Sequence, residues 1–479
     1  MIHWVRRISI CILMVLGTKD VMGKERPNLL FLLTDDQAPW ATGVTDPLGN
    51  AQTPHMDRLM SLGARLTHCY TPTPVCSPSR TVLMTSRYGT EFGITDWIHP
   101  RREPDLGVPA DVVMWPELLQ AAGYRTALIG KWHLGTTDEF HPTQNGFDVF
   151  MGHREGGWSP VNPTLEKDGR QKLLKGLTTD LLADEVIRFI EQNQEGDRPF
   201  LVCWHTRAPH TSWLPVRPED QAPYPETFVP RIPNADDPNL DVERVVRFTR
   251  EYLSSVRGVD RNLGRVMRKL DQLGLTDDTV IVFAADHGYS MGHNGIWHKG
   301  NGHWIVKDPP EATPNIPEGQ RPNMFDNSIF VPAAIVWPGV IAPGKLVENS
   351  ISFLDFFPTI LAMTGVDLPP NLNVRGRNFL PLLVGDSVPG WDDSIYGEYS
   401  THHQSQTHMR MWRTRDWKLV RDFRDPERDE FYDLKKDPGE TNNLIASKDP
   451  VVKKTIARFH DRIISRMRTL NDPVVKSLP

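Results

Sequence analysis

The chain alternates short apolar runs with longer segments of helical periodicity. Four apolar runs, at 28–33, 126–129, 200–204 and 280–285, end abruptly in polar positions. Runs of this length, bounded by Gly or polar residues, are typical of buried strands. The residues that follow them can take part in chemistry: Asp35, Asp36, Lys131, His133, His205, His210, Asp286 and His287.

Helical patterns lie between these runs. Pro54 follows Thr53 and precedes the stop at Gly63, which predicts a helix over 54–62. Further helices are predicted at 116–122, 179–193 and 242–273. Strands that alternate with helices predict a large, mostly parallel α/β sheet with helices on both faces. Ligands bind beyond the carboxyl ends of such strands, so the polar residues at those ends are expected to share one site.

The sequence pattern changes twice toward the C-terminus. Residues 301–323 are rich in Pro and lack periodicity, which predicts a long surface loop. Beyond residue 385 the patterns predict short strands at 395–399 and 417–420 and a closing helix at 450–467. We therefore predict a catalytic domain over 24–385 and a smaller C-terminal α+β subdomain over 386–479, with short antiparallel strands.

The N-terminus has the pattern of a secretory signal. Arg6 and Arg7 precede an apolar stretch at 8–17, and 1–23 is the predicted signal peptide. The apolar stretch is shorter than an ordinary membrane span, although an uncleaved anchor remains the alternative. We expect a secreted or periplasmic protein with no stable span after cleavage. The net charge of −6 argues against broad nucleic-acid binding.

Four cysteines are present, and Cys11 belongs to the predicted signal. Cys69 and Cys203 either pair or remain buried thiols, and the second interpretation is favoured. Cys76 stands apart because it opens the run Cys76-Ser77-Pro78-Ser79-Arg80. Taken alone, a thiol at this position is most often a disulfide partner or a packing residue.

The run from Cys76 to Arg80 resembles the first sulfatase signature, and Leu83 and Thr85 continue it. Ser86 stands where that pattern usually has Gly. The run 123–133 resembles the second sulfatase signature along its whole length. Pro209-His210, Asp286-His287-Gly288 and His298-Lys299-Gly300 resemble further active-site blocks, and the resemblance covers about 26–445. It implies an alkaline-phosphatase-like fold.

The resemblance also implies a modified nucleophile and a metal. In sulfatases the cysteine matching Cys76 is converted to formylglycine by a maturation enzyme. Asp35, Asp36 and Asp286 would repel one another unless a divalent cation joined them, and oxygen ligands favour Ca²⁺ or Mg²⁺. The family favours Ca²⁺, held with residue 76 and a residue that is often Asn. His287 stands at that position, which leaves Mg²⁺ or Mn²⁺ open.

The remaining roles follow from the same resemblance. Arg80, Lys131 and Lys299 supply positive charge to the sulfate. His210 protonates the leaving alcohol with help from Lys299, and His133 takes a proton when sulfate is released. His205 is the alternative candidate for the proton donor, although it is also interpretable as a packing histidine.

The expected substrate is a sulfated carbohydrate. Aromatic, Arg and His side chains suit a sugar pocket, and the candidates are Trp97, Arg102, Arg154, Trp158, His303 and Trp304, with His99, Arg101 and His293 beside them. Two other functions stay open. One is a phosphonate or phosphate ester hydrolase of the same superfamily, and the other is a non-catalytic protein that binds sulfated glycans.

Overall fold

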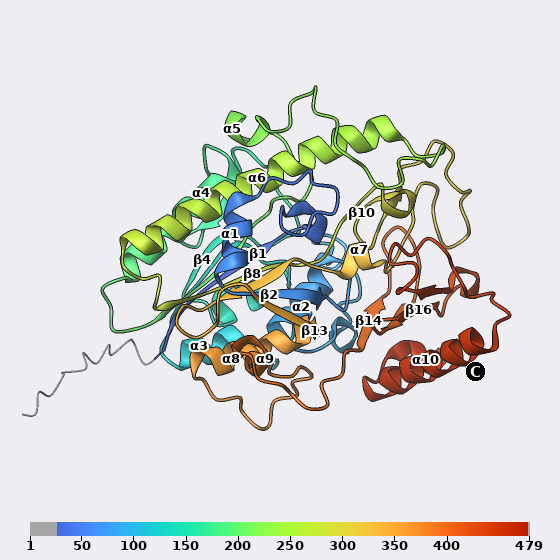
Figure 1. The fold of residues 1–479 in the computed structure, drawn as a ribbon. Helices are drawn as coiled ribbons and strands as arrows, with labels where there is room; N and C mark the ends of the chain where they lie inside the picture. The colour runs from blue at the N-terminus through green and yellow to red at the C-terminus, as the bar shows by residue number, and fades with distance from the viewer. Residues whose placement is uncertain (1–25, 478–479) are drawn as a thin grey trace, which may run out of the picture.

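A ten-stranded sheet forms the centre of the protein (Figure 1). The structure is a computed structural model, and it describes residues 26–477. The strand order is β13-β2-β12-β8-β1-β7-β3-β4-β5-β6. The strands are β1 (Asn28–Thr34), β2 (Ala64–Tyr70), β3 (Arg125–Lys131), β4 (Val149–His153), β5 (Thr164–Lys167), β6 (Arg170–Leu173), β7 (Phe200–His205), β8 (Thr279–Ala285), β12 (Ala333–Val336) and β13 (Lys345–Ser352).

The sheet is mixed but mostly parallel at its centre. β8, β1, β7, β3 and β4 run parallel to one another. β12 is antiparallel to both β2 and β8, and β5 and β6 extend the other edge as an antiparallel hairpin. The predicted fold class is confirmed, and the four strands predicted from the apolar runs lie side by side in this central part.

Helices cover both faces of the sheet (Figure 1). In β1, Leu29, Phe31 and Leu33 join one core cluster, and Leu30 and Leu32 join the other. This alternation arises because successive strand side chains point to opposite faces. The first cluster includes side chains of α2 (Cys76–Thr85), α3 (Trp115–Ala121), α8 (Phe356–Thr364) and α9 (Leu380–Val384). The second includes side chains of α1 (Pro54–Leu62), α4 (Thr178–Asn193) and α6 (Val242–Gln272).

A second, four-stranded antiparallel sheet lies toward the C-terminus. It has the order β14 (Ile395–Tyr399), β15 (Met409–Arg413), β16 (Trp417–Asp422) and β17 (Glu430–Asp433), and α10 (Pro450–Thr469) packs on it. The predicted short strands and closing helix are present. Side chains of this part and of the large sheet share one core cluster, and the subdomain boundary at 385/386 stays a prediction.

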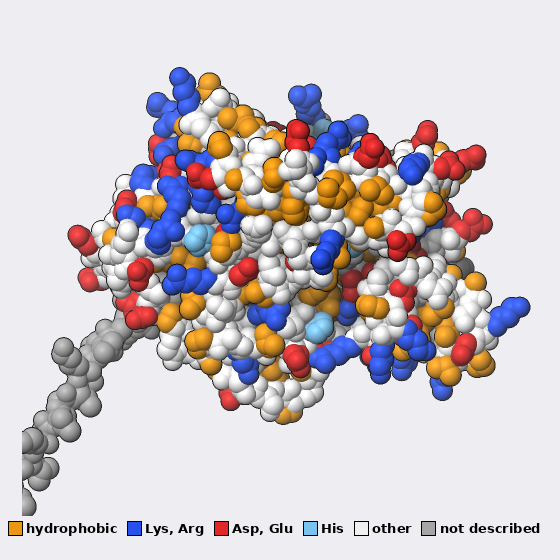
Figure 2. Space-filling model, turned by 45° about the horizontal axis from the view of Figure 1, so that its top comes forward, with side chains coloured by type: hydrophobic (Ala, Val, Ile, Leu, Met, Phe, Trp, Pro, Cys, Tyr) orange, Lys and Arg blue, Asp and Glu red, His pale blue; other side chains and the backbone are white. Residues whose placement is uncertain are grey.

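The predicted loop at 301–323 is partly ordered by pairing. β11 (His303–Trp304) pairs with β10 (Ile296–His298), which also pairs with β9 (Ser290–Met291). Two short helices, α5 (Pro218–Gln221) and α7 (Asp326–Ile329), complete the α-helices of the described residues. On the face in Figure 2, Lys and Arg side chains lie among Asp and Glu, so neither sign of charge covers it.

The described residues contain no helix that is long and apolar enough to cross a membrane. The predicted signal peptide lies outside the described residues.

Candidate active site

The carboxyl ends of four adjacent strands bring the predicted residues together. Asp35 and Asp36 follow β1, and Asp286 and His287 follow β8. Lys131 is the last residue of β3. Because β8, β1, β7 and β3 are neighbours, these side chains converge at one edge of the sheet, where α2 begins.

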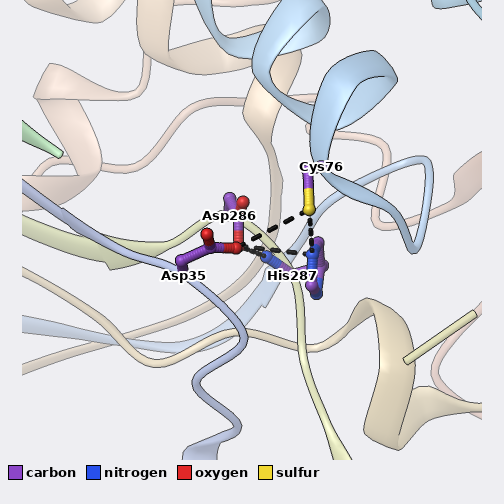
Figure 3. Close-up of side chains that lie close together, drawn as sticks. All are labelled: Asp35, Cys76, Asp286 and His287. Carbon is purple, nitrogen blue, oxygen red and sulfur yellow. Dashed lines mark hydrogen bonds and ion pairs between the residues drawn. The ribbon is translucent and has the colours of Figure 1, made fainter. Parts of the chain in front are cut away.

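Asp35, Cys76, Asp286 and His287 point toward a common centre (Figure 3). One potential ligand atom from each lies within 4.8 Å of the others, and all four residues are buried. His287 Nδ1 lies 3.0 Å from the Gly288 carbonyl, so a proton on Nδ1 is donated to the backbone. Its Nε2 then faces inward, 3.4 Å from Cys76 Sγ.

Asp36 joins this centre from one side. Its Oδ1 lies 3.2 Å from His287 Nε2, and its buried Oδ2 has no hydrogen-bond partner among the described residues. Carboxylate oxygens with an oriented imidazole fit a hard divalent cation, and the unpartnered Oδ2 supports that fit. Burial lowers the pKa of His287, but Asp286 and Cys76 together raise this pKa to about 9, so a cation on Nε2 would compete with a proton.

Three buried cations pair with the three carboxylates. Lys131 Nζ lies 2.6 Å from Asp35 Oδ2, and Lys299 Nζ lies 2.6 Å from Asp36 Oδ1. The third pair joins Arg80 Nε to Asp286 Oδ2 at 3.0 Å. Burial opposes ionisation of Asp35, yet Lys131 holds the pKa of that carboxyl well below its usual range.

The Cys76 thiol lies between the carboxylates and the cations. Its Sγ is 3.0 Å from Lys299 Nζ and 3.6 Å from Asp35 Oδ1. Burial raises the pKa of the thiol, but Lys131 and Lys299 outweigh burial and lower it to about 5. Cys76 forms no disulfide, and Cys69 and Cys203 are buried free thiols, as predicted.

A cavity of about 410 Å³ opens above Cys76. It is lined by Val75, Cys76, Trp97, Ile98, His99, Pro100, His133, Glu155, Gly156, Gly157, His210, His298, Lys299 and Asn301. A thiol at the floor of such a cavity, beside fixed cations and a candidate metal centre, suits chemistry on an anionic ester.

Comparisons with known proteins agree with this geometry. The family described as "Sulfatase" matches residues 27–366. The chain belongs to the sulfatase family. Residues 320–469 also match the family described as "N-sulphoglucosamine sulphohydrolase, C-terminal". The protein is therefore a sulfuric ester hydrolase, and its family generally uses a metal and a formylglycine.

Several named relatives are similar over most of this sulfatase. An N-acetylglucosamine-6-O-sulfatase of Bacteroides thetaiotaomicron is 27% identical, over 90% of this chain and 84% of the relative. The human N-acetylgalactosamine-6-sulfatase is 29% identical, over 75% of this chain and 66% of the relative. The solved structure of BT4656 in complex with its substrate D-glucosamine-2-N,6-O-disulfate superposes with a TM-score of 0.78 at 25% identity, covering 94% of this chain and 99% of that one.

The two rival histidines of the sulfatase occupy different surroundings. His210 lines the cavity, its Nδ1 lies 2.7 Å from the Thr211 carbonyl, and its Nε2 lies 4.0 Å from Asp36 Oδ2. His205 is 1% exposed and does not line the cavity, and its Nδ1 contacts the Lys131 carbonyl at 3.2 Å. Burial lowers the pKa of both, and that of His205 lies well below its usual range.

His133 also lines the cavity. It has a positive φ of 64°, which turns the chain directly after the strand. Its Nε2 lies 3.2 Å from the Ile98 carbonyl, and its buried Nδ1 has no hydrogen-bond partner among the described residues. A proton on Nε2 would leave Nδ1 as the basic nitrogen.

The predicted substrate residues are more scattered. Trp97 and His99 line the cavity, whereas the other candidates do not. Arg154 pairs with Asp138 and Glu166. The Trp158 ring packs on His153, His303 on Trp297 and His293 on Trp40. Trp304 lines a separate cavity, and Arg101 and Arg102 lie on the surface.

One wall of the cavity is fastened to the C-terminal part of the chain. The Glu103 carboxylate accepts from the backbone N–H of His99 at 2.9 Å and lies 2.7 Å from His402 Nε2. The His403 ring packs on Trp97 with centroids 4.5 Å apart. Sequence reasoning missed Glu103, His402 and His403, because no motif connects positions about 300 residues apart.

Proposed function

We propose that the protein is a secreted or periplasmic sulfatase that hydrolyses a sulfate ester on a carbohydrate. The observation that carries the proposal is the position of Cys76, on the cavity floor between Lys299 and the carboxylate centre. Support for a sugar substrate comes from the relatives, whose names specify 6-sulfated amino sugars. Trp97 in the cavity wall offers an aromatic face to such a ring.

Asp35, Asp36, Asp286 and His287 would hold the divalent cation, together with residue 76. Ca²⁺ is the preferred ion because carboxylate oxygens dominate the donor set, and His287 keeps Mg²⁺ or Mn²⁺ open. When bound, the cation polarises oxygens at the reacting centre.

Residue 76 would act after a maturation enzyme converts it to formylglycine, whose hydrated aldehyde supplies the nucleophilic oxygen. Lys299 contacts residue 76, and Lys131 pairs with Asp35 next to it. Both lysines therefore place positive charge where the sulfate oxygens would bind. Arg80 holds the Asp286 carboxylate and adds to the same field.

The histidines would move the protons. His210 Nε2 faces the cavity, and a proton held there passes to the leaving alcohol with help from Lys299. His133 Nδ1, which has no hydrogen-bond partner, accepts a proton from residue 76 as sulfate is released.

The test compares the protein made with and without a formylglycine-generating enzyme, beside Cys76→Ala. Free sulfate is measured from glycans of known sulfate position, and mass spectrometry reads the aldehyde at position 76. Release by the matured protein alone is expected. Equal release from matured and unmatured protein would contradict the role of residue 76. Confirmed aldehyde with faster release of phosphate or phosphonate would favour the other ester hydrolases.

A further inference from the structure

The cavity wall at 155–157 is held between two anchors. On one side, the Arg154 guanidinium pairs with Asp138 at 2.7 Å and Glu166 at 3.0 Å. On the other side, the Trp158 carbonyl accepts a hydrogen bond from Arg207, and its indole stacks on His153. Anchors on both sides fix the short segment that faces the cavity.

The same wall lies directly against the cavity histidines. A Cβ at Gly156 would lie 2.5 Å from Cε1 of His133, and a Cβ at Gly157 would lie 3.8 Å from Cε1 of His210. The absence of a side chain at 156 therefore lets the backbone approach the His133 ring, whereas a Cβ at 157 would make only an ordinary contact with His210. Glu155, the next residue along this wall, is carried to the cavity with them.

Glu155 has an unusual charge for its position. Among the described residues that line the cavity it is the one carboxylate, while Lys299 and four histidines form much of the remaining polar lining. Its side chain is exposed and has no hydrogen bond or ion pair to another described residue. A sulfate-binding cavity gains nothing from an anion unless the anion meets another part of the substrate.

We propose that Glu155 determines specificity by reading the group next to the scissile sulfate. Its carboxylate accepts hydrogen bonds from a hydroxyl, an amide N–H or an ammonium, and it repels a second sulfate or a carboxylate. The preferred substrates are therefore singly sulfated sugars whose neighbouring substituent is neutral or cationic. This inference rests on the proposed function, and it sets the chain apart from the relative whose substrate carries two sulfates.

Coulomb's law gives the expected loss of affinity for a substrate that carries a second anion. A second anion about 6 Å from the Glu155 carboxylate, in a partly solvated cavity mouth, weakens binding by about tenfold. The experiment measures kcat/KM of the matured protein for N-acetylglucosamine 6-sulfate and for glucosamine 2-N,6-O-disulfate. Glu155→Gln keeps the size of the side chain and removes its charge. The matched control is Glu195→Gln, which removes the same charge from an exposed position just after α4.

The wild type and Glu195→Gln are expected to prefer the monosulfate by tenfold or more, and Glu155→Gln to narrow that preference by about tenfold. A preference of the wild type for the disulfate, or a ratio that Glu155→Gln leaves unchanged, would overturn the inference.

Calorimetric binding of both sugars to Cys76→Ala, with and without Glu155→Gln, needs no turnover. A Kd ratio that favours the monosulfate and that Glu155→Gln narrows by about tenfold supports the role of Glu155, even if no sulfate is released. Equal or undetectable binding of the two sugars overturns it. Failure of turnover with this binding pattern would count against the proposed reaction alone.

Discussion

Replacing His210 tests the proposed proton donor most directly. A sugar alkoxide is a poor leaving group and needs a proton, whereas 4-nitrophenolate leaves without one. We therefore expect His210→Ala to lower kcat for a 6-sulfated sugar by about 10²- to 10⁴-fold, the range of general acid catalysis, or roughly 3–5 kcal/mol. With 4-nitrophenyl sulfate the loss should stay within about tenfold.

His205 provides the matched control because it is a histidine at the end of β7, the strand that leads into His210. Its Nδ1 contacts the Lys131 carbonyl, and it is excluded from the cavity. Burial lowers the pKa of both rings, so the contrast between them rests on contact with the cavity. His205→Gln should lower the free energy of unfolding by about 1–3 kcal/mol through lost buried hydrogen bonding and affect both substrates in the same proportion.

The assay measures kcat and KM of both variants on both esters at neutral pH, with the aldehyde content of each preparation known. The reasoning fails if His210→Ala lowers both rates equally. It also fails if the leaving-group dependence appears in His205→Gln instead.

Three further predictions concern other parts of the structure. Gly156→Ala should push the His133 ring out of place, because the new Cβ would lie 2.5 Å from Cε1, and steady-state kinetics should show a kcat loss of tenfold or more. Asp472→Ala should lower the unfolding free energy by about 3–5 kcal/mol in denaturant titrations, because the buried Arg410 guanidinium, 2.6 Å from Asp472, would lose its partner. Asp461→Ala on the exposed surface is the control. Burial raises the pKa of Glu398 to about 7, so the wild type should lose stability on the order of 3 kcal/mol between about pH 4.5 and 7, as the unfolded carboxyl ionises first. Glu398→Gln should flatten that slope, and an unchanged slope in melts across this range would contradict the assignment.

The centre of the fold was predictable because strand and chemistry occur together in the sequence. The runs that became β1, β3, β7 and β8 are mostly apolar and almost entirely buried, as expected of strands covered on both faces. The strand β2, which lies between β13 and β12, was not predicted, because Ala64–Tyr70 mixes polar and apolar residues without a strict alternation. Its place depends on partners distant in sequence, β12 and β13, which no local pattern reveals.

In the site, too, some features follow from local sequence patterns and others depend on tertiary packing. The structure brings the predicted residues at the strand ends together, whereas most of the predicted substrate residues do not line the cavity. Arg154 and Trp158 attracted attention through their chemistry, yet in the structure they anchor the wall, and the residues facing the cavity are Glu155 and the glycines between them. Sequence patterns identify which segment matters, but side-chain direction in an irregular segment is set by packing.

Three buried ion pairs join a Lys or Arg to an Asp in the site. Buried ion pairs seldom stabilise a fold beyond what apolar residues would, because desolvation of both charges offsets their attraction. Their arrangement here places each cation on a different element: Arg80 on α2, Lys131 at the end of β3 and Lys299 just after β10. The carboxylates thus fix three cations before any substrate arrives. An anionic ester bound as proposed would meet a field that needs no reorganisation, which is the condition under which electrostatic catalysis is strongest.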